Sequence, residues 1–458
     1  MNEFEIAKKL AENFQIVEAI DILESIAQKK SASNVFRLLA DLYYLSADPE
    51  RAAKNLLSAF EIEQDPDLYS KFLFMKNYRL TDPIQTRLLA EKFGRFYQNS
   101  QQIKFKKSKK IRVGFISPDF REHAVANFLS PIFKLDSKKF STFIYSTGAE
   151  DFITKKFRRN KVEWKNFHNR DHVDLYEAIR RDSIDILVDL AGHSQNNLLN
   201  VFGFRAASVQ ISMIGYTATT GLETMDYFLS DEICGESIDD FFTEKIVRMK
   251  KCHLCYSPIK TLPPVEKVNR DWISFGSFNN FSKVTDEILI AWKEILNSVL
   301  NSKLVIKAKI CSIPDGRKIL LERLSRLDLP VDRIEMRPYS QDYLEQYRDI
   351  DIMLDTFPYT GGLTTCESLS MGVPVVTIRG NSHGSRISSS ILTNTNLPEL
   401  ISKNVSEYIQ KSIELANNPD RIKNYRATLR EKIFSSPITD SKGYARNLEE
   451  IFCKILKE

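Results

Sequence analysis

The chain has 458 residues, of which 43% are apolar and 27% are charged, and it contains only 16 glycines and 16 prolines. This composition fits a globular protein of about three domains and excludes the disordered and fibrous classes. The net charge of +5, from 65 basic and 60 acidic residues, is too small to indicate a nucleic-acid-binding surface, so we expect no nucleic-acid partner.

The sequence lacks the features of a membrane or exported protein. No stretch approaches the roughly 18 consecutive apolar residues of a membrane span, and the N-terminal MNEFEIAKKLAENF carries acidic residues, unlike a signal peptide. The six cysteines are scattered and form no disulfide framework. Cys252 and Cys255 make a lone CHLC with no second pair to complete a zinc site, so we expect buried or free thiols there. Together these features predict a cytoplasmic protein.

Residues 1–100 are predicted to form helical repeats and linker helices. A 34-residue unit, SASNVFRLLADLYYLSADPERAAKNLLSAFEIEQ, is followed by DP and then by a third helical segment, LYSKFLFMKNY. The unit resembles a tetratricopeptide repeat, in which small residues let paired helices pack closely. Stepping back 33 residues places a matching apolar set at the N-terminus. The predicted inward positions are Ile6, Ala7, Leu10, Ala19, Leu23 and Ile26, then Phe36, Leu39, Ala40, Tyr43, Ala52, Leu56 and Ala59.

The next part of the chain changes to short β-rich runs that alternate with helical stretches. The basic run KFKKSKK (Lys104–Lys110) is interpreted as a solvated linker that leads into it. Near-continuous apolar strands separated by helices indicate parallel sheets buried on both faces, so we predict two doubly wound α/β domains, residues 110–258 and 270–458. The predicted strands are IRVGFIS, FSTFIYS, IDILVDLAG, VQISMIGY and MDYFLSD, then, after the connector SPIKTLPPVEKVNR, WISFGSF, KLVIKAK, RIEMRPY, DIMLDTF and VPVVTIRG.

Polar residues follow several of these strands, at the sheet edge where doubly wound folds bind ligands. Asp119 and His123 follow the first strand, and His193 follows IDILVDLAG. A single histidine after a strand is more often a hydrogen-bonded loop residue. Here three histidines, His123, His193 and His383, each follow a strand, so we favour a shared site. Asn279, Asn280 and Lys283 follow WISFGSF, where an ammonium could meet a phosphate. The remaining histidines, His168, His172 and His253, lie in polar loops or beside the connector, and we assign them no role.

The stretch DTFPYTGGLTTCESLSMGVPVV, from Asp355 to Val376, raises two interpretations. Gly361 and Gly362 would let the backbone approach a ligand, and Thr364 and Thr365 stand at the start of a predicted helix whose N–H groups suit a diphosphate. Glu367 could accept hydrogen bonds from a ribose. The alternative is an ordinary strand-to-helix turn with a threonine N-cap, and the chemistry favours the ligand cradle only slightly.

Other nucleotide and metal motifs are missing. The sequence has no GxGxxG and no GxxxxGK[ST]. Asp349 and Asp351 match the DxD pattern with which many sugar transferases hold a metal, but they lead directly into the strand IMLDTF. We therefore expect these acids to flank a helix–strand turn, and we infer no metal.

In their order along the chain, these segments resemble the protein O-linked N-acetylglucosamine transferases and their SPINDLY-like bacterial relatives, glycosyltransferase family 41. The similarity implies the GT-B architecture of two Rossmann-like lobes after a short repeat region, with a closing helix on the second, nucleotide-sugar-binding lobe. It also implies an inverting, metal-independent transfer without a cofactor, from UDP-N-acetylglucosamine to Ser or Thr of a protein acceptor. The matching segments are ISPDFREH, DILVDLAGHS, VQISMIGYTATTGLETMDYFLSD, FGSFNNFSKV, FPYTGGLTTCESLSMGVPVVT and HGSRISSSIL.

The resemblance also suggests roles for individual residues. His123 matches the histidine of the SPDFxxH loop that has been proposed as the base, and Lys283 matches the lysine that contacts the donor diphosphate and stabilises the leaving UDP. His193 stands where animal members carry a tyrosine, and we keep it as a catalytic candidate. The expected donor-binding residues are Asn280, Gly361, Gly362, Thr364, Thr365, Glu367 and His383.

Two alternatives remain open. SPINDLY-like members include protein O-fucosyltransferases, so the donor could be GDP-fucose. An inactive repeat-containing adaptor is the second, and the joint presence of Lys283, the two glycines, the threonines and Glu367 argues against it.

Overall fold

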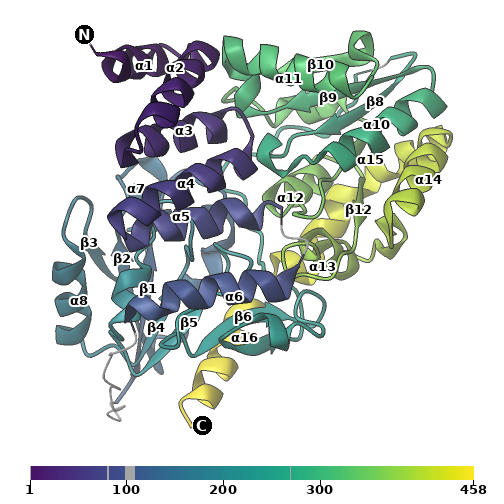
Figure 1. Cartoon of the computed structure of the whole chain (residues 1–458). Helices are drawn as coiled ribbons and strands as arrows, with labels where there is room; N and C mark the ends of the chain where they lie inside the picture. The colour runs from purple at the N-terminus through teal and green to yellow at the C-terminus, as the bar shows by residue number, and fades with distance from the viewer. Residues whose placement is uncertain (1, 80–81, 98–108, 269, 458) are drawn as a thin grey trace. The chain divides into compact units, whose positions relative to one another are not determined.

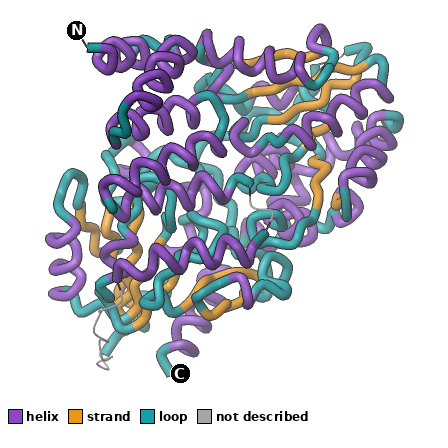
Figure 2. Tube along the Cα trace, in the orientation of Figure 1, coloured by secondary structure: helices purple, strands orange, loops and turns teal. Residues whose placement is uncertain are grey.

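A computed structural model describes residues 2–79, 82–97, 109–268 and 270–457 (Figure 1). These residues fall into two compact units. Most of the basic run Lys104–Lys110 lies outside the described residues. Unit 1 consists of Met1–Thr81, Leu262–Leu392 and Asn396–Ile433, and unit 2 of Asp82–Thr261, Thr393–Thr395 and Phe434–Glu458. Each unit contains one parallel sheet with helices around it, as the strand pattern predicts (Figure 2).

The predicted helical repeats are confirmed in unit 1, where five helices follow one another side by side (Figure 1). Residue chemistry fixes where helices begin: Asp48 and Asp65 cap the fourth and fifth helices, and a proline follows each of them at the first helical position. The helices are α1 (Glu3–Glu12), α2 (Ile16–Lys29), α3 (Ser33–Leu45), α4 (Pro49–Glu63) and α5 (Pro66–Asn77).

Most of the predicted inward positions of the repeats are buried, including Ala7, Leu23, Leu39 and Ala59. Leu10, Ile26 and Phe36 are only half-buried, and Ile6 is 40% exposed in the first helix of the stack, which is covered on one side. Two repeats are too few to be stable alone. Part of their support comes from within unit 1, where the N–H of Val17 in α2 donates to a carboxylate oxygen of Asp315 at 3.1 Å.

The sheet of unit 1 has six strands in the order β10-β9-β8-β11-β12-β13. The strands are β8 (Ile273–Ser277), β9 (Ser302–Lys307), β10 (Ile334–Arg337), β11 (Ile352–Leu354), β12 (Val375–Ile378) and β13 (Ile401–Ser402). The helices of this α/β part are α10 (Asp286–Ser298), α11 (Pro314–Arg326), α12 (Leu363–Ser370), α13 (Ile387–Asn394), α14 (Val405–Ala416) and α15 (Pro419–Phe434).

The sheet of unit 2 has seven strands in the order β3-β2-β1-β4-β5-β6-β7. The strands are β1 (Ile111–Ser117), β2 (Phe140–Ser146), β3 (Glu163–Asn166), β4 (Ile186–Asp189), β5 (Val209–Ser212), β6 (Tyr227–Asp231) and β7 (Lys245–Met249). Its helices are α6 (Pro83–Gly94), α7 (Phe152–Phe157), α8 (His172–Arg181), α9 (Leu199–Gly203) and α16 (Ser441–Ile455).

The core of unit 2 combines the sheet of that unit with α16, the last helix of the chain. Leu448 and Phe452 of α16 are fully buried in one cluster with Val113, Phe115 and Val188 from the sheet. The ring of Phe452 lies 6.3 Å from that of Phe140, measured between centroids. Residues separated by more than 300 positions therefore share one core.

All ten predicted strands are present, whereas β3, β7 and β13 were not predicted. Among the described residues, no helix is long and apolar enough to cross a membrane. Cys252 and Cys255 are buried, as expected for structural thiols.

Candidate functional site

In unit 1, the loop after β8 brings Lys283 to the Gly-rich turn. This loop ends in the short 3₁₀ helix η5 (Phe281–Lys283), which begins where the Asn280 side chain accepts a hydrogen bond from the Ser282 N–H at 3.1 Å. The Lys283 ammonium donates to the carbonyl oxygen of Thr360 at 3.0 Å and lies 4.1 Å from the centroid of the Tyr359 ring. Thr360 directly precedes Gly361, so the ammonium and the turn share one neighbourhood.

The turn is organised around Asp355, which the sequence analysis did not single out. The Asp355 carboxylate accepts from the N–H of Gly361 at 2.8 Å and from the hydroxyl of Thr377 at 2.8 Å. The amide of Asn279 adds a longer contact at 3.4 Å. Asp355 is 3% exposed and directly follows the apolar strand β11. An acidic residue directly after an apolar strand was the sequence signal that could have identified Asp355.

The prediction was that Gly361 lets the backbone approach a ligand. The structure shows a different reason why a glycine is needed at this position. A Cβ atom on Gly361 would lie 2.6 Å from the hydroxyl oxygen of Thr365 and 2.7 Å from that of Thr364. The missing side chain thus makes room for the two hydroxyls. The Thr364 hydroxyl donates to Asn279 at 3.1 Å, and the Thr365 hydroxyl lies 2.8 Å from that of Ser388.

The N-terminus of α12 follows directly. Gly362 is its N-cap residue, and no side chain caps the helix. The first N–H groups of a helix carry a partial positive charge and bind anions when no side chain occupies them. An ammonium and an uncapped helix terminus in one neighbourhood form an arrangement suited to a diphosphate.

Burial sets the protonation of this cluster. It lowers the pKa of Lys283 to about 8, and the nearby Asp355 carboxylate opposes the shift. Lys283 is therefore mostly charged at pH 7. Burial also raises the pKa of Asp355, against hydrogen bonds from Ser388, Thr377 and Gly361.

The other donor candidates of unit 1 are buried around the same turn. Glu367 is 4% exposed, and its carboxylate accepts hydrogen bonds from the hydroxyls of Tyr343 and, at 3.5 Å, Tyr347. His383 is 2% exposed and belongs to the loop whose Gly384 carbonyl accepts from the Thr360 N–H at 3.1 Å. In this structure Glu367 is held by tyrosines, so a ribose would have to share or replace those contacts.

The loop that carries Lys283 is also held by the repeat helices of unit 1. At the end of α5, the Tyr78 hydroxyl accepts from the side-chain amide of Asn280 at 3.2 Å, and the rings of Tyr78 and Tyr359 lie 5.9 Å apart. The adjacent Arg79 donates to the carbonyls of Ser282 at 2.5 Å and Val284 at 3.2 Å. Lys283 therefore sits on a segment that the repeats clamp.

In unit 2, the loop after β1 pairs His123 with Asp119. The Nδ1 atom of His123 lies 3.4 Å from a carboxylate oxygen of Asp119, and the imidazole is 40% exposed. Desolvation by the surrounding chain lowers the pKa of His123, and the Asp119 carboxylate opposes this. A neutral imidazole has an unprotonated nitrogen that can take a proton.

The second histidine of unit 2, His193, is packed inside the protein. It is 1% exposed, and its ring lies between those of Phe93 and Tyr216, with centroids 4.8 and 5.3 Å away. Its Nε2 donates to the carbonyl of Thr220 at 2.9 Å, and burial lowers its pKa to about 4. This geometry favours support of the loop at Thr220 over direct contact with substrate.

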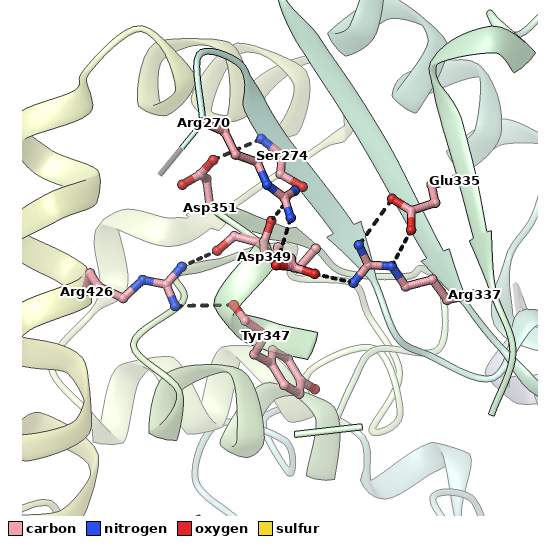
Figure 3. A network of polar contacts seen from close by, with 9 residues as sticks. Arg270, Ser274, Glu335, Arg337, Tyr347, Asp349, Asp351 and Arg426 are labelled. Atoms are coloured by element: carbon pink, nitrogen blue, oxygen red, sulfur yellow. Dashed lines mark hydrogen bonds and ion pairs between the residues drawn. The ribbon is translucent and has the colours of Figure 1, made fainter. Parts of the chain in front are cut away.

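The acids of the DxD pattern flank a helix–strand turn, as predicted. Both pair with protein cations, which Figure 3 shows for Asp349. Arg270 and Arg337 reach Asp349 at 2.7 and 2.9 Å. The Asp351 carboxylate accepts from the N–H of Ser274 at 3.0 Å and pairs with Lys267 at 2.9 Å. These contacts give the pair a role in joining strands.

Within unit 2, potential metal-ligand atoms of Asp231, Cys252 and His253 lie within 4.8 Å of one another. The Asp231 carboxylate already accepts hydrogen bonds from the N–H groups of Ile233 and Cys234 and from both the N–H and the Nδ1 of His253. A buried carboxylate satisfied in this way is explained by the fold.

Comparison with known proteins gives a consistent result. The model of Glycosyl transferase family 41 matches residues 91–267 and 264–448. SPINDLY of Arabidopsis thaliana, named as a probable UDP-N-acetylglucosamine–peptide N-acetylglucosaminyltransferase, is 37% identical over 361 residues, which are 76% of this chain and 40% of that protein. SEC of the same plant, which carries the same enzyme name, is 25% identical over 76% of this chain and 37% of its own length.

Solved structures give the same picture. An O-GlcNAc transferase mutant from Thermobaculum terrenum matches with a TM-score of 0.88 at 29% identity, over 96% of this chain and 87% of that one. A glycosyltransferase from Rickettsia africae shares the fold alone, with a TM-score of 0.51 at 12% identity, over 77% of this chain and all of that one. The architecture is GT-B-like, with repeat helices of the tetratricopeptide kind. The chain spans about two fifths of the length of the curated relatives it matches.

Proposed function

The chain belongs to glycosyltransferase family 41, and on that basis we propose that it transfers N-acetylglucosamine from UDP-N-acetylglucosamine to Ser or Thr hydroxyls of a polypeptide. The proposed reaction inverts the anomeric centre and needs no metal. The observation that carries the proposal is the Lys283 ammonium 3.0 Å from the Thr360 carbonyl, beside the uncapped N-terminus of α12.

The proposed chemistry assigns a role to each part of unit 1. Lys283 and the N-terminal amides of α12 bind the diphosphate and stabilise the charge that develops on the leaving UDP. Asn280, Gly361, Thr364 and Thr365 shape this cradle, with Gly362 as the N-cap. Glu367 holds the ribose, and His383 supports the cradle from the loop that contacts Thr360.

The proposed base is His123 of unit 2, oriented by Asp119. The imidazole takes the proton of the acceptor hydroxyl as the hydroxyl oxygen bonds to the anomeric carbon, and the bond from that carbon to the phosphate oxygen breaks. His193 is assigned a supporting role, because its burial leaves it packed against Phe93 and Tyr216.

The central test is loss of the Lys283 ammonium. Lys283→Ala should lower UDP release from UDP-N-acetylglucosamine about a hundredfold or more, the scale of removing one preorganised charge contact from a transition state. Lys303→Ala, in the neighbouring strand β9, is the matched control because Lys303 is exposed and its ammonium lies over the Trp272 ring, away from the turn. Unchanged turnover in Lys283→Ala would remove Lys283 from the mechanism.

The second candidate donor, GDP-fucose, is favoured by the higher identity to SPINDLY than to SEC, together with the fucosyl transfer that SPINDLY-like relatives are expected to include. A ligand that binds only the folded state raises the melting temperature. We would measure the melting temperature with UDP, GDP, UDP-sugars and GDP-sugars. UDP and the UDP-sugars should raise it. A shift with the guanosine set alone would reassign the donor.

A further inference from the structure

Unit 2 contains a cavity of about 370 Å³ at the carboxyl end of its sheet. Pro118, Thr147 and Phe167, which line it, directly follow β1, β2 and β3, and Asn196 lines it from the loop after β4. The chain runs outward from β1 to β2 and β3 and then returns to the other side of β1 as β4. Doubly wound sheets bind ligands at such a reversal of strand order, and ligand sites have volumes of roughly 300–1,000 Å³.

The cavity is lined by basic side chains that protein acids neutralise weakly or not at all. The Arg170 guanidinium lies 5.7 Å from the centroid of the Phe167 ring and forms no ion pair with any residue that the structure describes. Arg121 reaches an acid only at 4.0 Å, where Asp119 is already beside His123. His168, to which the sequence analysis gave no role, is a third basic member of the lining.

The remaining polar groups of the lining do not compete for the guanidinium groups. The hydroxyl oxygen of Thr147 has no hydrogen-bond partner among the described residues, but it is buried and adds no accessible group. Asp171 is the acid in the lining, but its carboxylate caps α8 by accepting from the Val173 N–H at 2.9 Å and lies 3.0 Å from Nδ1 of His172. Two guanidinium groups are thus left to meet an anion.

We propose that this cavity binds an anionic group, a carboxylate or phosphate, carried by the acceptor polypeptide. A guanidinium matches the paired oxygens of both groups and forms charge-assisted hydrogen bonds with them. Arg121 stands two residues before His123 in one loop, so the anionic residue would flank the acceptor hydroxyl. This inference rests on the proposed function, since it names the acceptor's chemistry.

The test compares two fluorescently labelled, capped hexapeptides, Gly-Glu-Glu-Ser-Glu-Gly and its counterpart with Gln in place of Glu. By fluorescence polarisation, the native protein should bind the Glu peptide about tenfold more tightly, and the double variant Arg121→Gln with Arg170→Gln should bind both alike. Arg181→Gln, in α8 and with a 71% exposed side chain that pairs with Glu177, should keep the preference. An unchanged melting-temperature shift with UDP shows that the double variant is folded.

Inorganic phosphate distinguishes the source of the anion. Competition by millimolar phosphate for the Glu peptide, lost in the double variant, would support the proposal. Phosphate binding that depends on both arginines, without a preference for the Glu peptide, would assign the cavity to a free small anion and overturn the proposal. Equal binding of the two peptides, no binding of either, or a preference that survives in the double variant would also overturn it. In each case a UDP shift would leave the proposed function standing.

Discussion

At the scale of single residues, the buried ammonium of Lys283 predicts a pH limit for donor binding. Its pKa of about 8 lies below the usual value because burial disfavours the charged form. The contact with a diphosphate needs that charge. The affinity for UDP-N-acetylglucosamine, whose diphosphate has no group that titrates near neutral pH, should therefore be nearly constant below about pH 7 and weaken by up to about tenfold per unit above about pH 8, measured by calorimetry.

The control for this prediction is Lys283→Arg. A guanidinium stays protonated throughout the range, so whatever affinity the variant retains should lose its dependence on pH. The same slope in Lys283→Arg would show that another group titrates.

Single residues also show where sequence-based prediction stops. Apolar runs mark the strands in the sequence. The sequence therefore predicted that Asn280, Lys283 and the Gly-rich turn lie just after strand ends. The role of Asp355 was not, because it depends on Gly361 and Thr377, which only the fold brings to its carboxylate. The burial of His193 likewise comes from Phe93, one hundred residues earlier in the chain.

At the scale of elements, the strands that were missed all lie at sheet edges. β3 and β7 are the two edges of the unit 2 sheet, and β13 is an edge in unit 1. An edge strand is covered less than a central one, so it needs no continuous apolar run. The sequence of β3, EWKN, has no fully buried residue, whereas the central β4, ILVD, is buried throughout. The apolar pattern of these three edge strands was therefore too weak to predict, whereas the fourth edge strand, β10, was predicted.

The contact of Arg79, two residues after α5, with the segment around η5 gives a prediction about how Lys283 is positioned. Arg79→Gln removes the guanidinium that donates to the carbonyls of Ser282 and Val284. Freed from these bonds, the loop would hold the Lys283 ammonium less well. UDP affinity should fall about tenfold, the scale of losing charge-assisted hydrogen bonds, measured by calorimetry.

A double-mutant cycle tells positioning from general loss of structure. Combined with Lys283→Ala, Arg79→Gln should add little further loss of UDP affinity, because both changes act on one contact. Arg37→Gln, which breaks an ion pair with Glu63 at 3.0 Å within the repeats, should leave affinity unchanged. Fully additive losses would mean that Arg79 does not act through Lys283.

At the scale of the whole molecule, each unit is built from segments far apart in the chain. The repeat helices share unit 1 with the second sheet, and α16 shares unit 2 with the first. Local patterns predicted both sheets, because strands and helices alternate over short distances. Which terminal helix accompanies which sheet depends on contacts across hundreds of residues, and no local pattern carries that information.

Phe452→Ala tests this arrangement. The ring is fully buried against the first sheet, so its removal should lower the free energy of unfolding of unit 2 by about 3–5 kcal/mol. Backbone amides of β1 and β2 should then exchange hydrogen faster, whereas the exchange rates of amides in β8 and β9 should change little. Phe152→Ala is the matched control, because 60% of that residue is exposed and its loss should leave exchange unchanged. A cavity destabilises most the core that has lost the ring. If exchange instead became faster mainly in β8 and β9, α16 would be shown to stabilise the sheet of unit 1.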